Sequence, residues 1–248
     1  MVTIMQQFYY IRKGDNKLSS PLELLKQIQT AEFEDEDGYP IEIELMPPIS
    51  KSELQKLESR IPAPIPNDII ELLQYCKGWY GLLDSVDFTG NFYFKMADLF
   101  PYGLPIAHDG FGNFWVIDFT SRSTCWGPVF FCCHDAPVIV YQADSLTEFL
   151  RDLIEFGMYM ESSKLNKVHE DYHFKIWREN PNILTYKECI NSNDQSLSQF
   201  AASLNPEFFI IDLQNPKIGD GFSWGRFGPK TILRRFGEER IFAYGRKE

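Results

Sequence analysis

The chain has 248 residues, a formal net charge of −11 and a hydrophobic content of 44% with 21 Phe. This content supports a packed core and excludes disorder as the default state. The negative charge repels phosphates, which argues against a general nucleic-acid binder, and no apolar run reaches the roughly 20 residues of a membrane-spanning helix. The N-terminus lacks the apolar core of a signal peptide, and the cysteine count is odd. We therefore expect a cytoplasmic protein with free thiols.

Four segments have the sequence features of helices. In three of them a Ser precedes a Glu by three positions, which is the capping-box spacing, and apolar residues follow at helical intervals. Gly78 stands where a left-handed cap is expected to end the third helix. The helices are predicted to begin at Ser20, at Ser50, at Asn67 or Asp68, and at Ser145.

Charge is distributed unevenly along the chain. Glu32 to Glu44 holds seven acidic residues and no Lys or Arg, whereas residues 226–248 carry a local charge of +4. The acidic segment ends in IEIEL, 41–45, whose strict alternation predicts a half-exposed strand with Glu42 and Glu44 on its outer face. Both charged segments favour solubility, and the basic end of the chain could also lie against acidic surface elsewhere in the molecule.

From residue 79 to residue 142, short aromatic and β-branched runs alternate with turn residues, which predicts an antiparallel sheet. The central stretch is IAHDGFGNFWVIDF, 106–119, a strand, a Gly-rich turn and a second strand whose two faces are both apolar. With the helices, this order indicates an α+β fold, an antiparallel sheet flanked by helices. The expected strands are Phe92–Lys95, Leu104–Ala107, Phe114–Phe119, Val129–Cys133 and Val138–Tyr141.

The ordered motifs IPAPIPNDIIELLQYCKGW, IAHDGFGNFWVIDF, GPVFFCCHD and ADSLTEFLRDL resemble the SUKH superfamily of Smi/Knr glucan-synthesis-regulator-like proteins, over about residues 47–157. The resemblance implies a non-enzymatic interaction module. Bacterial members are associated with immunity against toxins, including nucleases, and fungal relatives with cell-wall synthesis and its signalling. The family's recurring hairpin residues correspond to Asp109, Gly110, Gly112, Asn113 and Trp115, which we take as determinants of either fold or binding.

The resemblance divides the chain into an N-terminal helix and acidic segment (1–46), a SUKH-like domain (47–157) and a C-terminal α+β extension (158–248) packed on or beside it. In the extension we expect a helix, a strand and a final hairpin. These elements are predicted over Leu197–Leu204, over Phe208–Leu213, and over Thr231–Phe236 with Arg240–Tyr244.

Two clusters are candidate chemical sites. Cys132, Cys133 and His134 lack a CxxC partner, so buried structural thiols are the simpler interpretation. HEDYH matches the zincin pattern HExxH at His169, Glu170 and His173, but its flanks are mixed and no third histidine follows. We expect no metal and no cofactor.

Three hypotheses follow. The first is a protein-binding immunity protein that neutralises a basic toxin, of which a nuclease is one example, with no direct binding to nucleic acid or membrane. The second is a scaffold of cell-wall or stress signalling, and the third is a metal-dependent hydrolase using HEDYH. For the first, the candidate contact residues are Glu34, Asp35, Glu36, Asp37, Glu42, Glu44, Asp109, Asn113 and Trp115.

Overall fold

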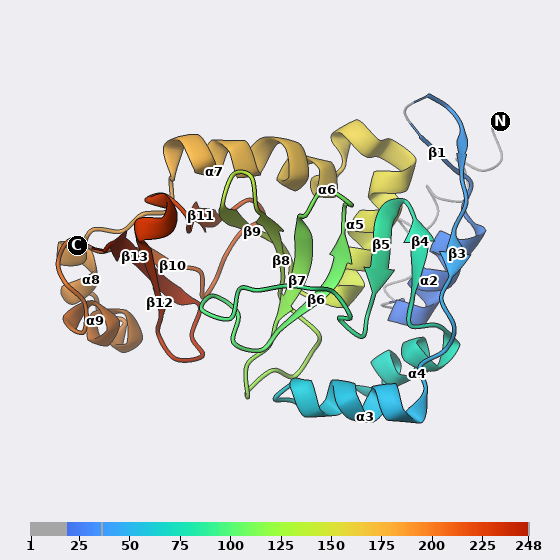
Figure 1. Cartoon of the computed structure of the whole chain (residues 1–248), viewed down its shortest axis with the longest axis horizontal. Helices are drawn as coiled ribbons and strands as arrows, with labels where there is room; N and C mark the ends of the chain where they lie inside the picture. Colours follow the sequence, from blue (N-terminus) through green and yellow to red (C-terminus); the bar gives the residue numbers. More distant parts are fainter. Residues whose placement is uncertain (1–18, 36, 248) are drawn as a thin grey trace.

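The computed structural model describes residues 19–35 and 37–247 and has the expected α+β architecture (Figure 1). A π-helix, η2 (Lys167–Tyr172), joins α6 to α7. The α-helices are α2 (Pro21–Thr30), α3 (Lys51–Arg60), α4 (Asn67–Tyr75), α5 (Leu146–Tyr159), α6 (Lys164–Asn166), α7 (His173–Glu179), α8 (Tyr186–Ile190) and α9 (Gln195–Ala202).

An antiparallel sheet of eight strands, in the order β11-β9-β8-β7-β6-β5-β4-β3, forms the centre of the molecule. Because neighbours in this order are mostly consecutive in sequence, the sheet is a meander built from hairpins. Its strands are β3 (Glu44–Leu45), β4 (Gly78–Gly81), β5 (Leu83–Asp87), β6 (Gly103–His108), β7 (Phe114–Asp118), β8 (Val129–Cys133), β9 (Val138–Ala143) and β11 (Gly221–Ser223).

Two smaller sheets complete the fold. β1 (Phe33–Glu34) pairs with β2 (Pro40–Ile41) in the acidic segment. In the C-terminal extension, β13 (Ile241–Arg246) lies between β10 (Phe209–Asp212) and β12 (Thr231–Arg235), and this sheet stands beyond β11 at the left of Figure 1. The strand, helix and hairpin expected in the extension are therefore present.

Both faces of the main sheet are covered, as the apolar side chains on both faces of β7 predict. Trp115 and Ile117 belong to the core shared with α2, α4 and α5, whereas Val116 belongs to a second core on the opposite face. That second core includes Phe222 and Phe242 of the extension. The extension thus adds a strand to the sheet and covers part of one face.

The helix starts agree with the sequence. Ser20 with Glu23 and Ser50 with Glu53 form complete capping boxes, and the Ser145 hydroxyl accepts a hydrogen bond from the backbone N–H of Glu148.

Three local predictions were wrong. The alternating run IEIEL is split between β2 and β3, which pair with different strands, so it is not one strand. Phe92–Lys95 is not a strand. Gly78 does not cap α4, which ends at Tyr75; it begins β4, where an added Cβ would lie 1.9 Å from the Val86 carbonyl oxygen.

Candidate functional site at the turn end of the main sheet

Several connections gather at one end of the main sheet, which we call the turn end. The register pairs Ser85 with His108, Phe114 with Cys132, and Cys133 with Val138. The β4–β5, β6–β7 and β8–β9 turns therefore share this end, together with the start of β3, at the top of the sheet in Figure 1. The turn end brings together parts of the chain that are far apart in sequence.

The β6–β7 turn at residues 109–113 is held by the side chain of Asp109. Its Oδ1 accepts hydrogen bonds from the backbone N–H groups of Phe111 (2.9 Å) and Asn113 (3.2 Å). Its Oδ2 accepts from the Asn113 amide and pairs with His169 Nε2 at 3.0 Å. Burial raises the pKa of Asp109, but these hydrogen bonds outweigh burial and lower the pKa to about 2.

Three of the chain's four histidines contact this turn, and the fourth, His173, lies next to one of them. His108 Nδ1 accepts from the backbone N–H of Gly110, and His134 Nδ1 lies 3.1 Å from Asn113 Oδ1. His169 stacks on Trp115 with an interplanar angle of 15°, and its ring centre lies 6.4 Å from that of His173. The turn is therefore braced by β6, by the β8–β9 turn and by η2 of the extension.

A carboxylate outside the turn pairs with each of the three histidines that contact it. His108 Nε2 lies 3.4 Å from Asp84, His134 Nε2 lies 3.0 Å from Asp135, and His169 Nδ1 contacts Glu170. The side chains of these three acids are 55%, 88% and 54% exposed, respectively. Acidic groups consequently surround the turn at the surface.

The acidic segment lies at the same end of the sheet. Glu44 pairs with Tyr80 of β4, and the backbone at Glu42 approaches Gly81 closely. Phe33 of β1 and Leu82 of the β4–β5 turn both lie against Gly157 of α5. The segments 32–44, 81–85, 108–114 and 133–138 together contain no Lys or Arg, so the turn end has a strongly negative surface.

The structure separates the predicted contact residues into exposed and buried groups. Glu34, Asp35, Asp37, Glu42 and Glu44 are exposed. Asp109 and Asn113 are partly buried and hold the turn, whereas Trp115 is fully buried in the core, so its structural role is in packing. Glu36 lies outside the described residues.

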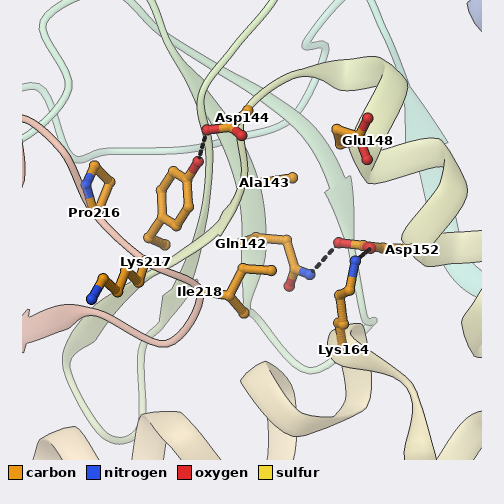
Figure 2. Close-up of a pocket in the computed structure, with 10 residues that line it drawn as sticks. Gln142, Ala143, Asp144, Glu148, Asp152, Lys164, Pro216, Lys217 and Ile218 are labelled. Carbon is orange, nitrogen blue, oxygen red and sulfur yellow. Dashed lines mark hydrogen bonds and ion pairs between the residues drawn. The ribbon is translucent and has the colours of Figure 1, made fainter. Parts of the chain in front are cut away.

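A cleft of about 270 Å³ lies between the end of β9, the start of α5 and residues 216–218 (Figure 2). On its floor, Gln142 accepts from Trp115 Nε1 at 3.4 Å and donates to Asp152 Oδ2 at 2.9 Å. Lys164 Nζ lies 3.5 Å from Asp152 Oδ1. Burial raises the pKa of Asp152. These polar groups satisfy one another and hold the indole of Trp115 in place.

HEDYH does not form a metal centre. Both ring nitrogens of His169 contact carboxylates, one of them in the β6–β7 turn, and His173 lies in the core at 7% exposure. Within residues 19–35 and 37–247, no group of three or more His, Cys, Asp or Glu side chains is arranged to hold a metal ion. The role of His169 is to join the extension to the turn.

The cysteines are reduced and do not form a nucleophilic site. Burial raises the pKa of Cys76 to about 11, and it raises the pKa values of Cys132 and Cys133 as well. A reactive cysteine needs the opposite shift, since the thiolate is the nucleophile.

The SMI1/KNR4 family (SUKH-1) matches residues 48–152. This part of the chain is a SUKH-1 domain. It runs from the connection before α3 to the middle of α5, and it includes the β6–β7 turn. The SUKH-1 family is typical of immunity proteins and is generally non-catalytic. No curated protein and no solved structure matches the chain significantly.

Sequence reasoning missed Asp84, Asp135 and Phe111, which lie beside or within the β6–β7 turn. Asp84 is a single acid in β5, and Asp135 and Phe111 are a single acid and a single aromatic in turns, so only the strand pairing shows that the three converge. In the described part of the chain, no helix is both long enough and apolar enough to cross a membrane.

Proposed function

We propose that this protein is a non-enzymatic immunity protein that binds and neutralises a basic toxin through its SUKH-1 domain and the acidic segment that precedes this domain. The observation that carries the proposal is the concentration of exposed carboxylates at the turn end of the main sheet, on segments of the SUKH-1 domain and of the preceding acidic segment that contain no Lys or Arg. A surface of this kind attracts a basic protein and accelerates its association.

A nuclease toxin fits this charge pattern. Its nucleic-acid groove must be lined by Lys and Arg to hold phosphates, and a surface rich in carboxylates can occupy the same groove. Inhibition then needs no catalysis by the immunity protein, because occupation of the groove excludes the substrate. The exposed carboxylates of Glu34, Asp35, Asp37, Glu42 and Glu44 are the proposed contact groups.

The test begins with affinity capture by the full chain from a lysate of its source organism, at low and at moderate salt. We expect one dominant basic protein, lost as the salt concentration rises. That protein is then expressed alone and together with this chain in a test host. Growth arrest that co-expression relieves supports toxin neutralisation, whereas growth arrest that persists contradicts it.

The scaffold hypothesis predicts a different outcome of the same capture. A scaffold would retain several partners of no particular charge, none of them toxic when expressed alone. That outcome would replace toxin neutralisation with an assembly role for the same domain.

A further inference from the structure

We propose that Phe111, at the tip of the β6–β7 turn, is the apolar anchor of the partner contact and inserts into an apolar pocket with a basic rim on the toxin. This inference rests on the proposed function and adds the position of the contact and the chemistry of the partner surface. Phe111 is 81% exposed, the most exposed large hydrophobic side chain in the described residues.

Exposure alone is common for single apolar side chains and does not mark an interface. Phe111 differs because the backbone that carries it is fixed on both sides. Its own N–H donates to Asp109, the N–H of Gly110 before it donates to His108 Nδ1, and the N–H of Asn113 after it donates to Asp109. The ring is therefore presented by a rigid loop.

Rigidity matters for binding because a side chain on a preordered loop loses less conformational entropy when the complex forms. The hydrogen bonds of Asp109, Asn113 and the surrounding histidines hold the turn before any partner arrives. A fixed, protruding aromatic ring is typical of the residues that dominate the binding energy of an interface.

The surroundings of Phe111 specify the partner. Asp84 lies beside Gly110, and His134, which pairs with Asp135, lies beside Gly112. Glu170 reaches the turn through His169. An apolar tip among carboxylates is complementary to an apolar pocket surrounded by Lys and Arg. A neutral or acidic pocket is disfavoured, because the carboxylates around Phe111 would be buried there without a positively charged partner.

The first experiment places a benzoylphenylalanine photo-crosslinker at position 111 or, as a matched control, at position 102. Tyr102 is also an exposed aromatic residue, at 39%, but it precedes β6 at the opposite end of that strand. After irradiation in the source organism's lysate, we expect an adduct from position 111 only. Mass spectrometry should map it to a segment of the captured basic protein that combines apolar residues with Lys or Arg.

The second experiment measures the affinity of the captured protein for Phe111→Ala and Tyr102→Ala. We expect Phe111→Ala to raise Kd by about 30-fold, the effect of a hot-spot residue. Tyr102→Ala should change Kd by less than about threefold. The melting temperature of Phe111→Ala should equal that of the wild type, since the ring is exposed.

The outcomes separate the two proposals. If the toxin is captured and neutralised but Phe111→Ala binds it like the wild type, or if adducts form equally at both positions, the anchor is overturned and the function stands. If no toxin is captured or neutralised, the proposed function fails and the anchor falls with it.

Discussion

Asp109 and Asp118 lie near the two ends of β7 and stabilise the molecule in different ways. Asp109 holds the β6–β7 turn, whereas Asp118 is fully buried and binds two arginines of the extension. Its carboxylate pairs with Arg235 Nη1 and with Arg240 Nε, both at 2.8 Å. The basic C-terminal segment thus contacts an acidic residue of the SUKH-1 domain, but this residue is buried and does not belong to an acidic surface.

Replacement of Asp118 should be strongly destabilising. Asp118→Asn removes the charge that compensates Arg235, whose side chain is 3% exposed, and leaves a buried guanidinium without its counter-ion. Breaking such a pair costs about 3–5 kcal/mol. Urea unfolding measures the loss, and Arg122→Ala is the control because it breaks only the exposed pair with Glu239. Equal unfolding midpoints for the two variants would contradict a stabilising role for Asp118.

His169 should make stability depend on pH. Burial lowers its pKa, but pairing with Asp109 and Glu170 outweighs burial and raises the pKa above the usual 6.5. Its stabilising effect is therefore complete below pH 6.5 and is lost as the pH rises through the raised value. Asp109 has the opposite effect at acidic pH, because its pKa is lowered to about 2 from the usual 3.8. Its contribution to stability is present above pH 3.8 and is lost as the pH falls towards 2.

His169→Gln tests this dependence. The variant should lose about 1–3 kcal/mol of unfolding free energy at about pH 6 and less at a second pH value above the raised pKa of the wild-type imidazole, where that ring is neutral as well. Urea unfolding at the two pH values provides the comparison. A loss that is the same at both would show that the ion pair with Asp109 does not stabilise the fold.

At the scale of elements, most strands of the main sheet and the helix starts could be predicted, because capping boxes and short aromatic or β-branched runs bounded by turn residues are local signals. β8 was predicted to the residue, over Val129–Cys133. The strands β4 and β5 were not predicted, because Gly78 was interpreted as a helix cap. The structure gives a different reason for glycine at this position, since the Val86 carbonyl occupies the space that a Cβ would need. The turn end could not be predicted as a site, since it depends on the pairing of β3 to β9.

β11 shows how the extension depends on the main sheet. Gly221 pairs with Val140, and an added Cβ at Gly221 would lie 1.9 Å from the Ile139 carbonyl oxygen. Gly221→Ala should therefore separate β11 from β9 and cost more than about 2 kcal/mol, measured by thermal or urea unfolding. Hydrogen exchange of β9 amides should accelerate in the same variant. Unchanged exchange would indicate that β11 contributes little to the sheet.

The domain boundary at residue 157 stays a prediction, and β11 gives a way to test it. A chain that ends at 157 loses Phe222, Phe242 and Tyr244 from the second core and leaves β9 as an open edge. We expect this fragment to aggregate, because an apolar face and an unpaired strand are both exposed. A monomeric fragment with a cooperative unfolding transition would show instead that the chain up to residue 157 folds without the extension.

For the whole molecule, the separation of charge determines how a partner approaches. The C-terminal segment carries +4 against a total of −11, so the remaining residues form a strongly negative body whose carboxylates are dense at the turn end. Long-range attraction acts on the association rate, while contacts such as that proposed for Phe111 act mainly on dissociation. The two effects can be separated by measuring both rates for the captured toxin.

A triple variant, Glu42→Gln, Glu44→Gln and Asp84→Asn, removes three exposed carboxylates from the turn end. We expect its association rate with the captured toxin to fall at least tenfold at low salt, with little change in the dissociation rate. Added salt should reduce the wild-type association rate towards that of the variant, because screening shortens the range of the attraction to about 10 Å at 0.1 M. A wild-type rate that does not change with salt would exclude electrostatic steering, and the acidic turn end would then need to act through short-range contacts alone.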